Sequence, residues 1–145
     1  MIDGSKVSLA KITKLDFTIG RPVLILEFPG CKKSFTLNRE VFSIGRHPEN
    51  SLVLDDKQVS RCHAMIAWLK SQDRHGNWQR NYWIIDGKGS KQRSRNGIFI
   101  NGVKKVNYIL RNEDIITIAN NIQITYRFIT YNTDNNKMLK TVYYL

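Results

Sequence analysis

Cysteine is scarce in this chain, which has Cys31 and Cys62 as its two cysteines among 145 residues. So few cysteines, in a chain whose start shows no secretory signal, predict reduced thiols rather than a disulfide framework. The histidines, His47, His63 and His75, do not combine with the cysteines at any zinc-binding spacing. The sequence therefore predicts no metal site, no cofactor and no Cys–His catalysis.

Long hydrophobic runs are also missing. The longest uninterrupted apolar segments cover residues 23–26, 64–69 and 82–85, whereas a membrane-spanning helix needs about 18 or more apolar residues. The first residues, Met-Ile-Asp-Gly-Ser-Lys, include no charged stretch followed by the apolar segment of a signal peptide. We therefore expect no membrane span and no secretion, and place the protein in the cytoplasm or in an organelle matrix such as a plastid stroma.

Acidic residues are outnumbered, with 12 Asp and Glu against 23 Lys and Arg, a net charge of +11 and a pI near 9.9. The excess is densest at Lys88, Lys91, Arg93 and Arg95, which lie within eight residues that contain no acid. Such a charge favours anionic partners. A cationic loop in isolation is also typical of a solvated surface, so the neighbouring motifs must decide between the two interpretations.

A helical hydrophobic stripe of useful length is absent, and the periodicity is that of strands. Segment 122–128 alternates apolar and polar residues, as a strand does when one of its faces lies in the core. Segments 23–28 and 64–69 are apolar on both faces and are interpreted as interior strands. Turn-forming residues punctuate the chain at 29–30, 47–50, 73–77, 96–97, 101–102 and 120–121. The pattern predicts an all-β sandwich or barrel.

The length of 145 residues corresponds to one domain. We expect the domain over residues 22–129, between an N-terminal extension, 1–21, and a C-terminal tail, 130–145, because the two ends fit the strand pattern poorly. The last part of the tail, 138–145, fits a short helix, an added strand or a disordered segment equally well.

Short motifs follow one another in the loops between the predicted strands. They are Gly45-Arg46, Ser60-Arg61-Cys62-His63, Asn96-Gly97 and Asn101-Gly102. Each motif is common alone, but in this order the series resembles the forkhead-associated (FHA) family, whose pattern is Gly-Arg, Ser-x-x-His and two Asn-Gly pairs. The resemblance covers about residues 22–129. It implies a β-sandwich of two mostly antiparallel sheets with these loops at one end, and it implies binding of phosphothreonine peptides without enzymatic activity.

The residue types in this series suit a phosphate ligand. A phosphorylated side chain carries about −1.5 to −2 charges and three strong acceptors. The planar guanidinium of Arg46 can bind two phosphate oxygens, while Ser60 offers a short hydroxyl. Arg61 or Arg95 can add a second positive charge, and the Asn96 amide suits a passing peptide backbone. The candidate phosphopeptide-binding residues are Arg46, Ser60, Arg61, Ser94, Arg95 and Asn96.

Other residues of the motifs are expected to hold the loops in shape. Gly45, Gly97 and Gly102 fit positions that need a special backbone conformation, and Asn101 fits a turn. Asn96 fits a turn and a peptide contact about equally. In the FHA family the histidine that matches His63 is a buried brace for the serine loop, and the same role is expected here.

Gln58 stands where the family often reads the third residue after the phosphothreonine. An uncharged amide at that position predicts no strong demand for aspartate. The carboxylates Asp55, Asp56 and Asp86 have no nucleophile, metal set or water-activating partner nearby in the sequence, so surface or loop-bracing roles are expected for them rather than catalysis.

The chain departs from the family pattern at several positions. Ile98 stands where the family usually has threonine, and Glu113 and Ala119 stand where it often has glycine. The loop 86–94 is longer than usual and carries Lys88, Lys91 and Arg93. This loop either widens the positive field, which would favour acidic or multiply phosphorylated ligands, or displaces Ser94 and Arg95 from the phosphate.

The leading hypothesis is an adaptor module that docks a phosphothreonine-containing partner protein, phosphorylated by an upstream Ser/Thr kinase. A basic nucleic-acid-binding protein is the first alternative, disfavoured because the sequence has no aromatic-rich RNA-binding motif, zinc knuckle or basic recognition helix. The second alternative is a subunit that recognises a protein without phosphate. The oligomeric state is left open.

Overall fold

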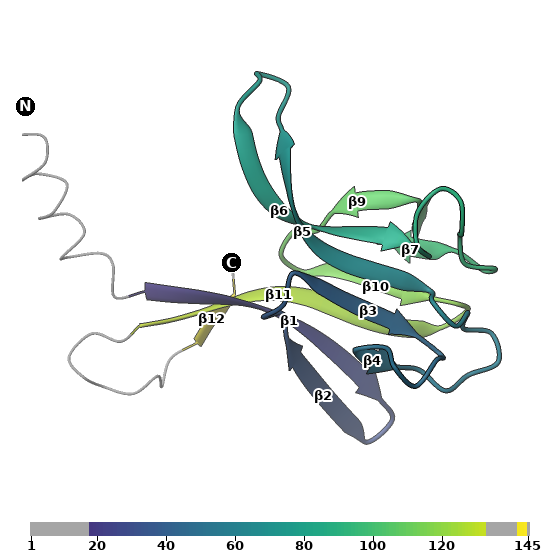
Figure 1. The fold of residues 1–145 in the computed structure, drawn as a ribbon. Coiled ribbons are helices and arrows are strands. Elements are labelled where there is room, and N and C mark those ends of the chain that lie inside the picture. Colours follow the sequence, from purple (N-terminus) through teal and green to yellow (C-terminus); the bar gives the residue numbers. More distant parts are fainter. Residues whose placement is uncertain (1–17, 133–141, 145) are drawn as a thin grey trace, which may run out of the picture.

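A computed structural model describes residues 18–132 and 142–144 of the chain. Figure 1 shows two sheets packed face to face. The first sheet contains β1 (Thr18–Phe28), β2 (Cys31–Thr36), β7 (Ile98–Ile100), β8 (Val103–Lys105), β10 (Asp114–Ile118), β11 (Ile122–Asn132) and β12 (Val142–Tyr144). The second contains β3 (Val41–Gly45), β4 (Leu52–Val53), β5 (Ala64–Gln72), β6 (Trp78–Asp86) and β9 (Asn107–Ile109).

The strand order is β2-β1-β11-β10-β7-β8 in the first sheet, with β12 beside β11, and β4-β3-β5-β6-β9 in the second. The pairs are antiparallel apart from β3 and β4, which pair in parallel over two residues. The predicted all-β sandwich of two mostly antiparallel sheets is therefore confirmed.

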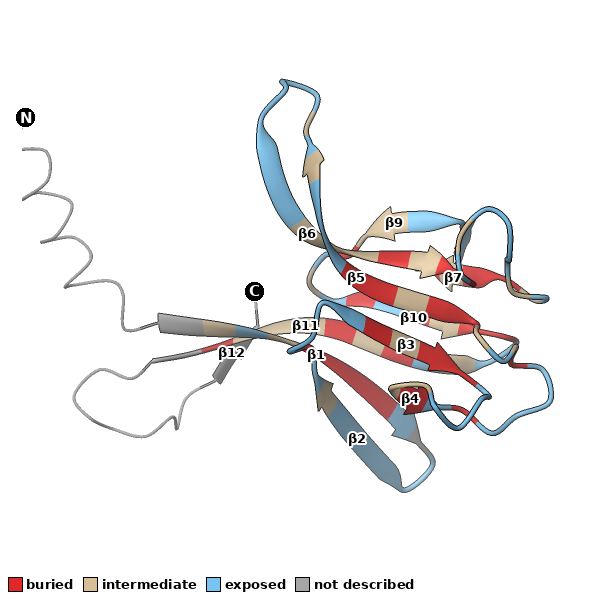
Figure 2. Cartoon of the chain, in the orientation of Figure 1, coloured by how far each residue is buried: buried red, intermediate tan, exposed pale blue. Residues whose placement is uncertain are grey.

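Alternating side chains build the core between the sheets. In β11, Ile124 and Tyr126 are buried, whereas Gln123, which precedes Ile124, is exposed. The alternation in the sequence predicts this pattern. Both sheets contribute side chains with 0% exposure: Leu24, Ile116, Ile118 and Ile124 from the first, and Ile44, Ile66 and Ile84 from the second. Figure 2 shows this buried band running through the facing strands. Each such side chain stabilises the fold by about 1.5–3 kcal/mol relative to an exposed one.

The prediction that segments 23–28 and 64–69 are buried on both faces is confirmed for residues 23–26, but it is wrong at the exposed Glu27 and at the end of the second segment. In β1, Val23 and Ile25 are buried as well as the core-facing Leu24 and Leu26. In β5 the prediction fails at the end of segment 64–69, because Trp68 and Leu69 are exposed at 37% and 40%.

The exposed part of β5 belongs to a two-stranded ribbon. β5 and β6 pair out to Gln72 and Trp78, and Figure 1 shows that their far ends project beyond the sandwich. The turn closes at Asp73, whose carboxylate accepts hydrogen bonds from the backbone N–H groups of His75 and Asn77 at 2.8 and 2.9 Å. These hydrogen bonds lower the pKa of Asp73. The predicted turn at 73–77 is thus present at the tip of the ribbon.

The first sheet extends past the expected domain boundaries. β1 begins at Thr18 and β11 ends at Asn132, and these two residues are backbone partners. The tail contributes an added strand, since β12 pairs with β11 opposite Ile129 to Tyr131. The rest of the predicted extension and tail, residues 1–17, 133–141 and 145, lies outside the described residues.

Candidate functional site

The strands bring three of the four motif loops to one end of the sandwich, whereas the expected placement of Asn101-Gly102 beside them is wrong, because this pair follows the other end of β7 (Ile98–Ile100). β3 ends at Gly45, β5 begins at Ala64 and β6 ends at Asp86. Because β5 is antiparallel to both of its neighbours, these three strand termini lie side by side at the same end of the second sheet. The loop after β6 returns to the first sheet at Ile98, which begins β7. The predicted site residues are therefore gathered rather than scattered.

Arg46 is held by the loop that faces it. Its Nε donates a hydrogen bond to the backbone oxygen of Val59 at 3.0 Å, and its backbone N–H donates to the oxygen of Ser60 at 3.0 Å. The side chain is otherwise exposed. In the described part of the chain the ion pairs are Lys32–Glu27 and Arg127–Glu113, so Arg46 has no acidic partner there. The terminal guanidinium nitrogens are available to an external anion.

Gly45 permits the close approach of two loops. A Cβ atom at this position would lie 2.1 Å from the backbone oxygen of Arg61 and 2.8 Å from Nδ2 of Asn50. Asn50 occupies the gap by donating from Nδ2 to the backbone oxygens of Arg61 at 2.7 Å and His47 at 2.9 Å. The bracing role of Asn50 was not predicted, although an asparagine in a turn that follows a functional arginine is a usable signal.

His63 lies fully buried beneath the loops at 0% exposure. Its Nδ1 accepts a hydrogen bond from the backbone N–H of Ser60 at 3.0 Å, which leaves the ring proton on Nε2 to donate to the oxygen of Gly97 at 2.8 Å. One side chain thus ties the Ser60 loop to the Gly97 loop. These contacts agree with the predicted brace.

The Ser60 hydroxyl lies at the meeting point of the two loops. Its Oγ accepts a hydrogen bond from the backbone N–H of Arg95 at 2.9 Å. This contact shows that the long loop after β6 does not carry Arg95 away from Ser60. The hydroxyl hydrogen has no acceptor among the described residues, and it can be donated to a ligand.

Ser94 is engaged inside the loop. Its hydroxyl donates to Oδ1 of the buried Asp86 at 2.5 Å and accepts from the backbone N–H of Gly97 at 2.9 Å. Ser94 does not line the hollow that contains Ser60. A direct contact between Ser94 and a ligand stays a prediction. The Asp86 carboxylate accepts from the backbone N–H and the hydroxyl of Ser94, and these hydrogen bonds brace the loop.

Asn96 and Gln58 lie side by side. Nδ2 of Asn96 donates to the backbone oxygen of Gln58 at 2.8 Å, and Oδ1 of Asn96 has no hydrogen-bond donor within residues 18–132 and 142–144. The Gln58 side chain is exposed. The free Oδ1 can accept a hydrogen bond from an extended peptide passing over the loop.

The second Asn-Gly pair forms a turn away from this meeting point. Asn101 has φ 51° and Gly102 has φ 86°. The Asn101 side chain donates to Asp114 Oδ1 at 2.9 Å and accepts from the backbone N–H of Ile115 at 2.9 Å. Glu113 and Ala119 also have positive φ, 74° and 58°. These two positions therefore have the positive-φ conformation that glycine favours, although neither residue is a glycine.

Four of the six candidate binding residues, Arg46, Ser60, Arg61 and Arg95, line one hollow of about 250 Å³, whereas Ser94 and Asn96 do not line it. Its lining consists of Arg46, Lys57, Gln58, Val59, Ser60, Arg61 and Arg95. Four of these carry a positive charge and none carries a negative one, so the hollow attracts anions. Lys57 was not predicted, because a lone lysine before a motif is indistinguishable from a solvated surface residue.

A larger hollow of about 350 Å³ has the opposite charge, since Glu27, Asp55 and Asp56 are among its lining residues and no cation is. It would repel phosphate. Over the described residues no cluster of His, Cys, Asp or Glu suits a metal ion, and no helix has the length and apolarity of a membrane span.

The comparisons with known proteins place the chain in a family. The FHA domain family model matches residues 42–119, more than half of the sequence, and the chain belongs to the FHA family. An uncharacterised protein of Synechocystis, sll1895, is 37% identical over 106 residues, which are 73% of this chain and 15% of that protein. The DNA damage response protein kinase DUN1 of Saccharomyces cerevisiae is 32% identical over 108 residues, 72% of this chain and 20% of the kinase. The chain thus spans a small part of these relatives.

Solved structures agree with this assignment. The Slr1951 protein from Synechocystis has a TM-score of 0.59 at 27% identity, over 74% of this chain and 95% of that one. The yeast Dun1 FHA domain, solved in complex with a doubly phosphorylated (pT) peptide derived from Rad53 SCD1, has a TM-score of 0.56 at 28% identity, over 74% of each chain.

Proposed function

We propose that this chain is a phosphothreonine-peptide-binding adaptor module that docks a partner protein phosphorylated by a Ser/Thr kinase. The observation that carries the proposal is the convergence of Arg46, Ser60, Arg61 and Arg95 on one cationic hollow. Membership of the FHA family and the phosphopeptide complex of the related Dun1 domain support it.

Each residue has a chemical role in this proposal. Arg46 is oriented through its Nε, so its terminal nitrogens bind two phosphate oxygens. Ser60 accepts from the Arg95 backbone and therefore directs its hydroxyl hydrogen to a phosphate oxygen. The guanidinium groups of Arg61 and Arg95 neutralise the remaining charge, since a phosphate monoester carries about −1.5 to −2 charges at neutral pH.

The neighbouring residues read the peptide around the phosphate. Asn96 accepts a peptide N–H through its free Oδ1, because Nδ2 is held by the Gln58 backbone. Gln58 presents an uncharged amide to a residue beside the phosphothreonine, which favours no particular charge there. Ser94 braces Asp86 against Gly97, and a contact of its hydroxyl with the ligand stays a prediction.

The proposal is one of recognition without catalysis. A serine nucleophile needs a base within hydrogen-bonding distance of its hydroxyl. The imidazole of His63 instead accepts from the backbone N–H of Ser60 and donates to Gly97, and Nδ1 of His47 accepts from the backbone N–H of Glu49. Ser60 therefore functions as a hydrogen-bond donor.

Peptide titration tests the proposal. We expect wild-type protein to bind a phosphothreonine peptide and to bind the unmodified peptide far more weakly. Arg46→Ala should lose about ten- to a hundredfold in affinity, because a charge-assisted hydrogen bond contributes about 1.5–3 kcal/mol. Arg74→Ala is the matched control: it removes the same charge from the ribbon turn and should bind as wild type does. Equal binding of the phosphorylated and unmodified peptides would contradict the proposal.

The same titrations separate the alternatives. Nucleic-acid binding weakens steeply with salt and falls only modestly when a single arginine is removed. Binding of a protein partner that survives phosphatase treatment would favour phosphate-independent recognition instead.

A further inference from the structure

A second cationic hollow lies beside the first. It has a volume of about 340 Å³ and is lined by His47, Ser60, Arg61, Cys62, Lys88, Gln92 and Arg93. Ser60 and Arg61 also line the hollow assigned to phosphothreonine. The two hollows are therefore adjacent, and one ligand can contact both.

The loop that supplies Lys88 and Arg93 is held by its own backbone. Gly87 donates to the oxygen of His63 at 2.7 Å, Lys88 donates to Gln92 at 2.8 Å, and Gln92 donates to Gly89 at 3.1 Å. The loop closes so tightly that a Cβ atom at Gly87, where φ is 62°, would lie 2.0 Å from the Gln92 oxygen. Because the His63 ring also accepts from the backbone N–H of Ser60, both walls of the second hollow are attached to one buried residue, one through its backbone oxygen and the other through its side chain.

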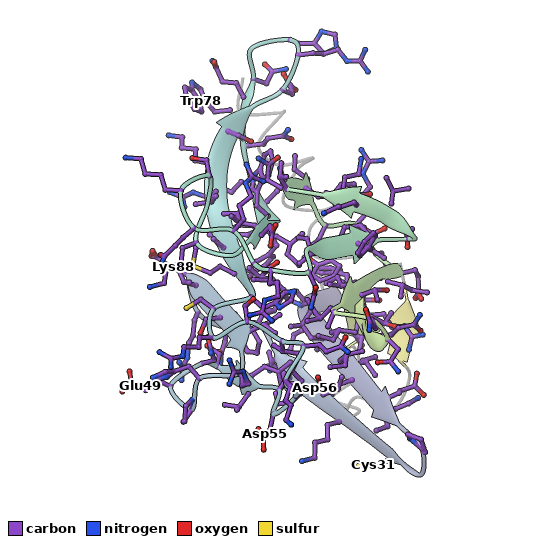
Figure 3. All side chains as sticks on the ribbon, turned by 90° about the vertical axis from the view of Figure 1, so that its right-hand side faces the viewer. Cys31, Glu49, Asp55, Asp56, Trp78 and Lys88 are labelled. Carbon is purple, nitrogen blue, oxygen red and sulfur yellow. The ribbon has the colours of Figure 1, made fainter. Side chains whose placement is uncertain are left out.

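The charges of this hollow are not compensated within the described chain. Arg61, Lys88 and Arg93 are exposed, no acid lines the hollow, and none of the three belongs to the ion pairs of residues 18–132 and 142–144. Glu49 lies at the same edge as Lys88 in Figure 3, but its side chain does not line the hollow. Like charges held together in this way repel one another, and an anionic ligand relieves that repulsion.

We propose that the second hollow binds a second phosphorylated side chain of the same peptide. This inference rests on the proposed function of the first hollow. A phosphoryl group matches the site better than a carboxylate because it carries more charge and three acceptor oxygens. An extended peptide rises about 3.3–3.6 Å per residue, so a residue a few positions from the phosphothreonine can reach a hollow that shares Ser60 and Arg61 with the first.

A peptide series tests this inference. The series holds the phosphothreonine fixed and places phosphoserine, aspartate or alanine two, three or four positions before or after it. We expect one phosphoserine position to bind wild-type protein about tenfold more tightly than its alanine counterpart, with aspartate at that position giving a smaller gain. No gain at any position would overturn the inference while leaving the proposed function intact.

Variants of the loop locate the effect. Lys88→Ala and Arg93→Ala should abolish most of the gain from the second phosphate but keep the affinity for the singly phosphorylated peptide. Lys91→Ala is the matched control, because Lys91 lies in the same loop, is exposed and carries the same charge, but does not line the hollow. We expect Lys91→Ala to keep the gain.

The outcomes are distinct. If Lys91→Ala loses as much of the gain as Lys88→Ala, the second phosphate responds to the general positive field and the assigned hollow is wrong. If wild-type protein does not bind the singly phosphorylated peptide, the proposed function fails and this inference fails with it.

Discussion

The backbone N–H of Ser60 and the Nδ1 atom of His63 are joined by a hydrogen bond of 3.0 Å, while the opposite ring nitrogen of His63 reaches the oxygen of Gly97 at 2.8 Å. A side chain with no exposed surface therefore sets the distance between the two loops that line the cationic hollow. The spacing of Ser60 and Arg95 depends on this residue, although it does not line the hollow itself.

Replacing His63 with alanine should lower the free energy of unfolding by about 2–4 kcal/mol, since it leaves a cavity and two unpaired backbone groups. Phosphopeptide affinity should fall as well, because Ser60 and Arg95 lose their spacing. Denaturant unfolding and peptide titration measure the two effects. His75→Ala, in the exposed ribbon turn, is the control and should change neither quantity.

Alanine substitutions of Asn96 and Asn101 should have different effects, one on phosphopeptide affinity and the other on the free energy of unfolding. Asn96→Ala removes the free Oδ1 acceptor and should weaken phosphopeptide binding several-fold with little effect on unfolding. Asn101→Ala removes the hydrogen bonds to Asp114 and Ile115 and should lower the free energy of unfolding by about 1–3 kcal/mol with unchanged affinity. The reverse assignment of the two effects would show that Asn96 is the structural residue.

Gly45→Ala should be more damaging than Gly102→Ala. The new Cβ of Gly45→Ala would meet the backbone oxygen of Arg61 at 2.1 Å, so a loop must shift. We expect a loss of about 1–3 kcal/mol in unfolding free energy from this overpacking. At Gly102, where φ is 86° but no atom lies within 4 Å, the loss should be about 1 kcal/mol. Chemical denaturation of both variants makes the comparison.

The stability of the fold should decline at high pH through Tyr126. Burial, followed by the nearby Tyr82 and Asp114, raises the pKa of Tyr126 from 10.0 to about 12. The folded state therefore keeps a proton that the unfolded chain loses, so the contribution is complete below pH 10 and is lost as the pH rises towards 12. Relative to Tyr126→Phe, wild-type protein should lose roughly 1.4 kcal/mol between pH 8 and pH 11. A constant difference between the two proteins would contradict this assignment.

Two positively charged residues face each other across the β5–β6 ribbon, and reversing the charge of one of them tests their repulsion. Lys70 and Arg80 are direct cross-strand partners, and such pairs are destabilising. Arg80→Glu should raise the free energy of unfolding by about 0.2–1 kcal/mol at low salt, with the gain shrinking in 1 M NaCl. Gln79→Glu introduces a negative charge opposite Ser71 instead and should give a smaller change.

Much of the fold follows from the sequence because alternation reports burial directly, as Ile124 and Tyr126 show. The ribbon was not predicted, since the apolar Trp68 and Leu69 resemble the residues of an interior strand whether or not a second sheet covers them. Where the strands place the loops was predicted only through the family resemblance.

Within the site, the motif order identified the residues that converge, but individual contacts depended on spatial neighbours. The hydrogen bond from Asn50 to Arg61 joins two different loops, and that from Ser94 to Asp86 closes the long loop after β6 on itself. Periodicity and spacing carry no information about such pairs. The positive φ at Glu113 and Ala119 was likewise hidden, because neither residue type indicates it.

The pairing of Thr18 with Asn132 has a practical consequence. Thr18 and Asn132 lie at one end of the first sheet, whereas the pairs Ile98–Ile118 and Ile118–Ile122 place the loops that line the cationic hollow at the other end of the same sheet. A fluorescent reporter joined ahead of Thr18 is therefore expected to leave the cationic hollow accessible. Peptide titration of such a fusion should give the affinity of the unfused protein.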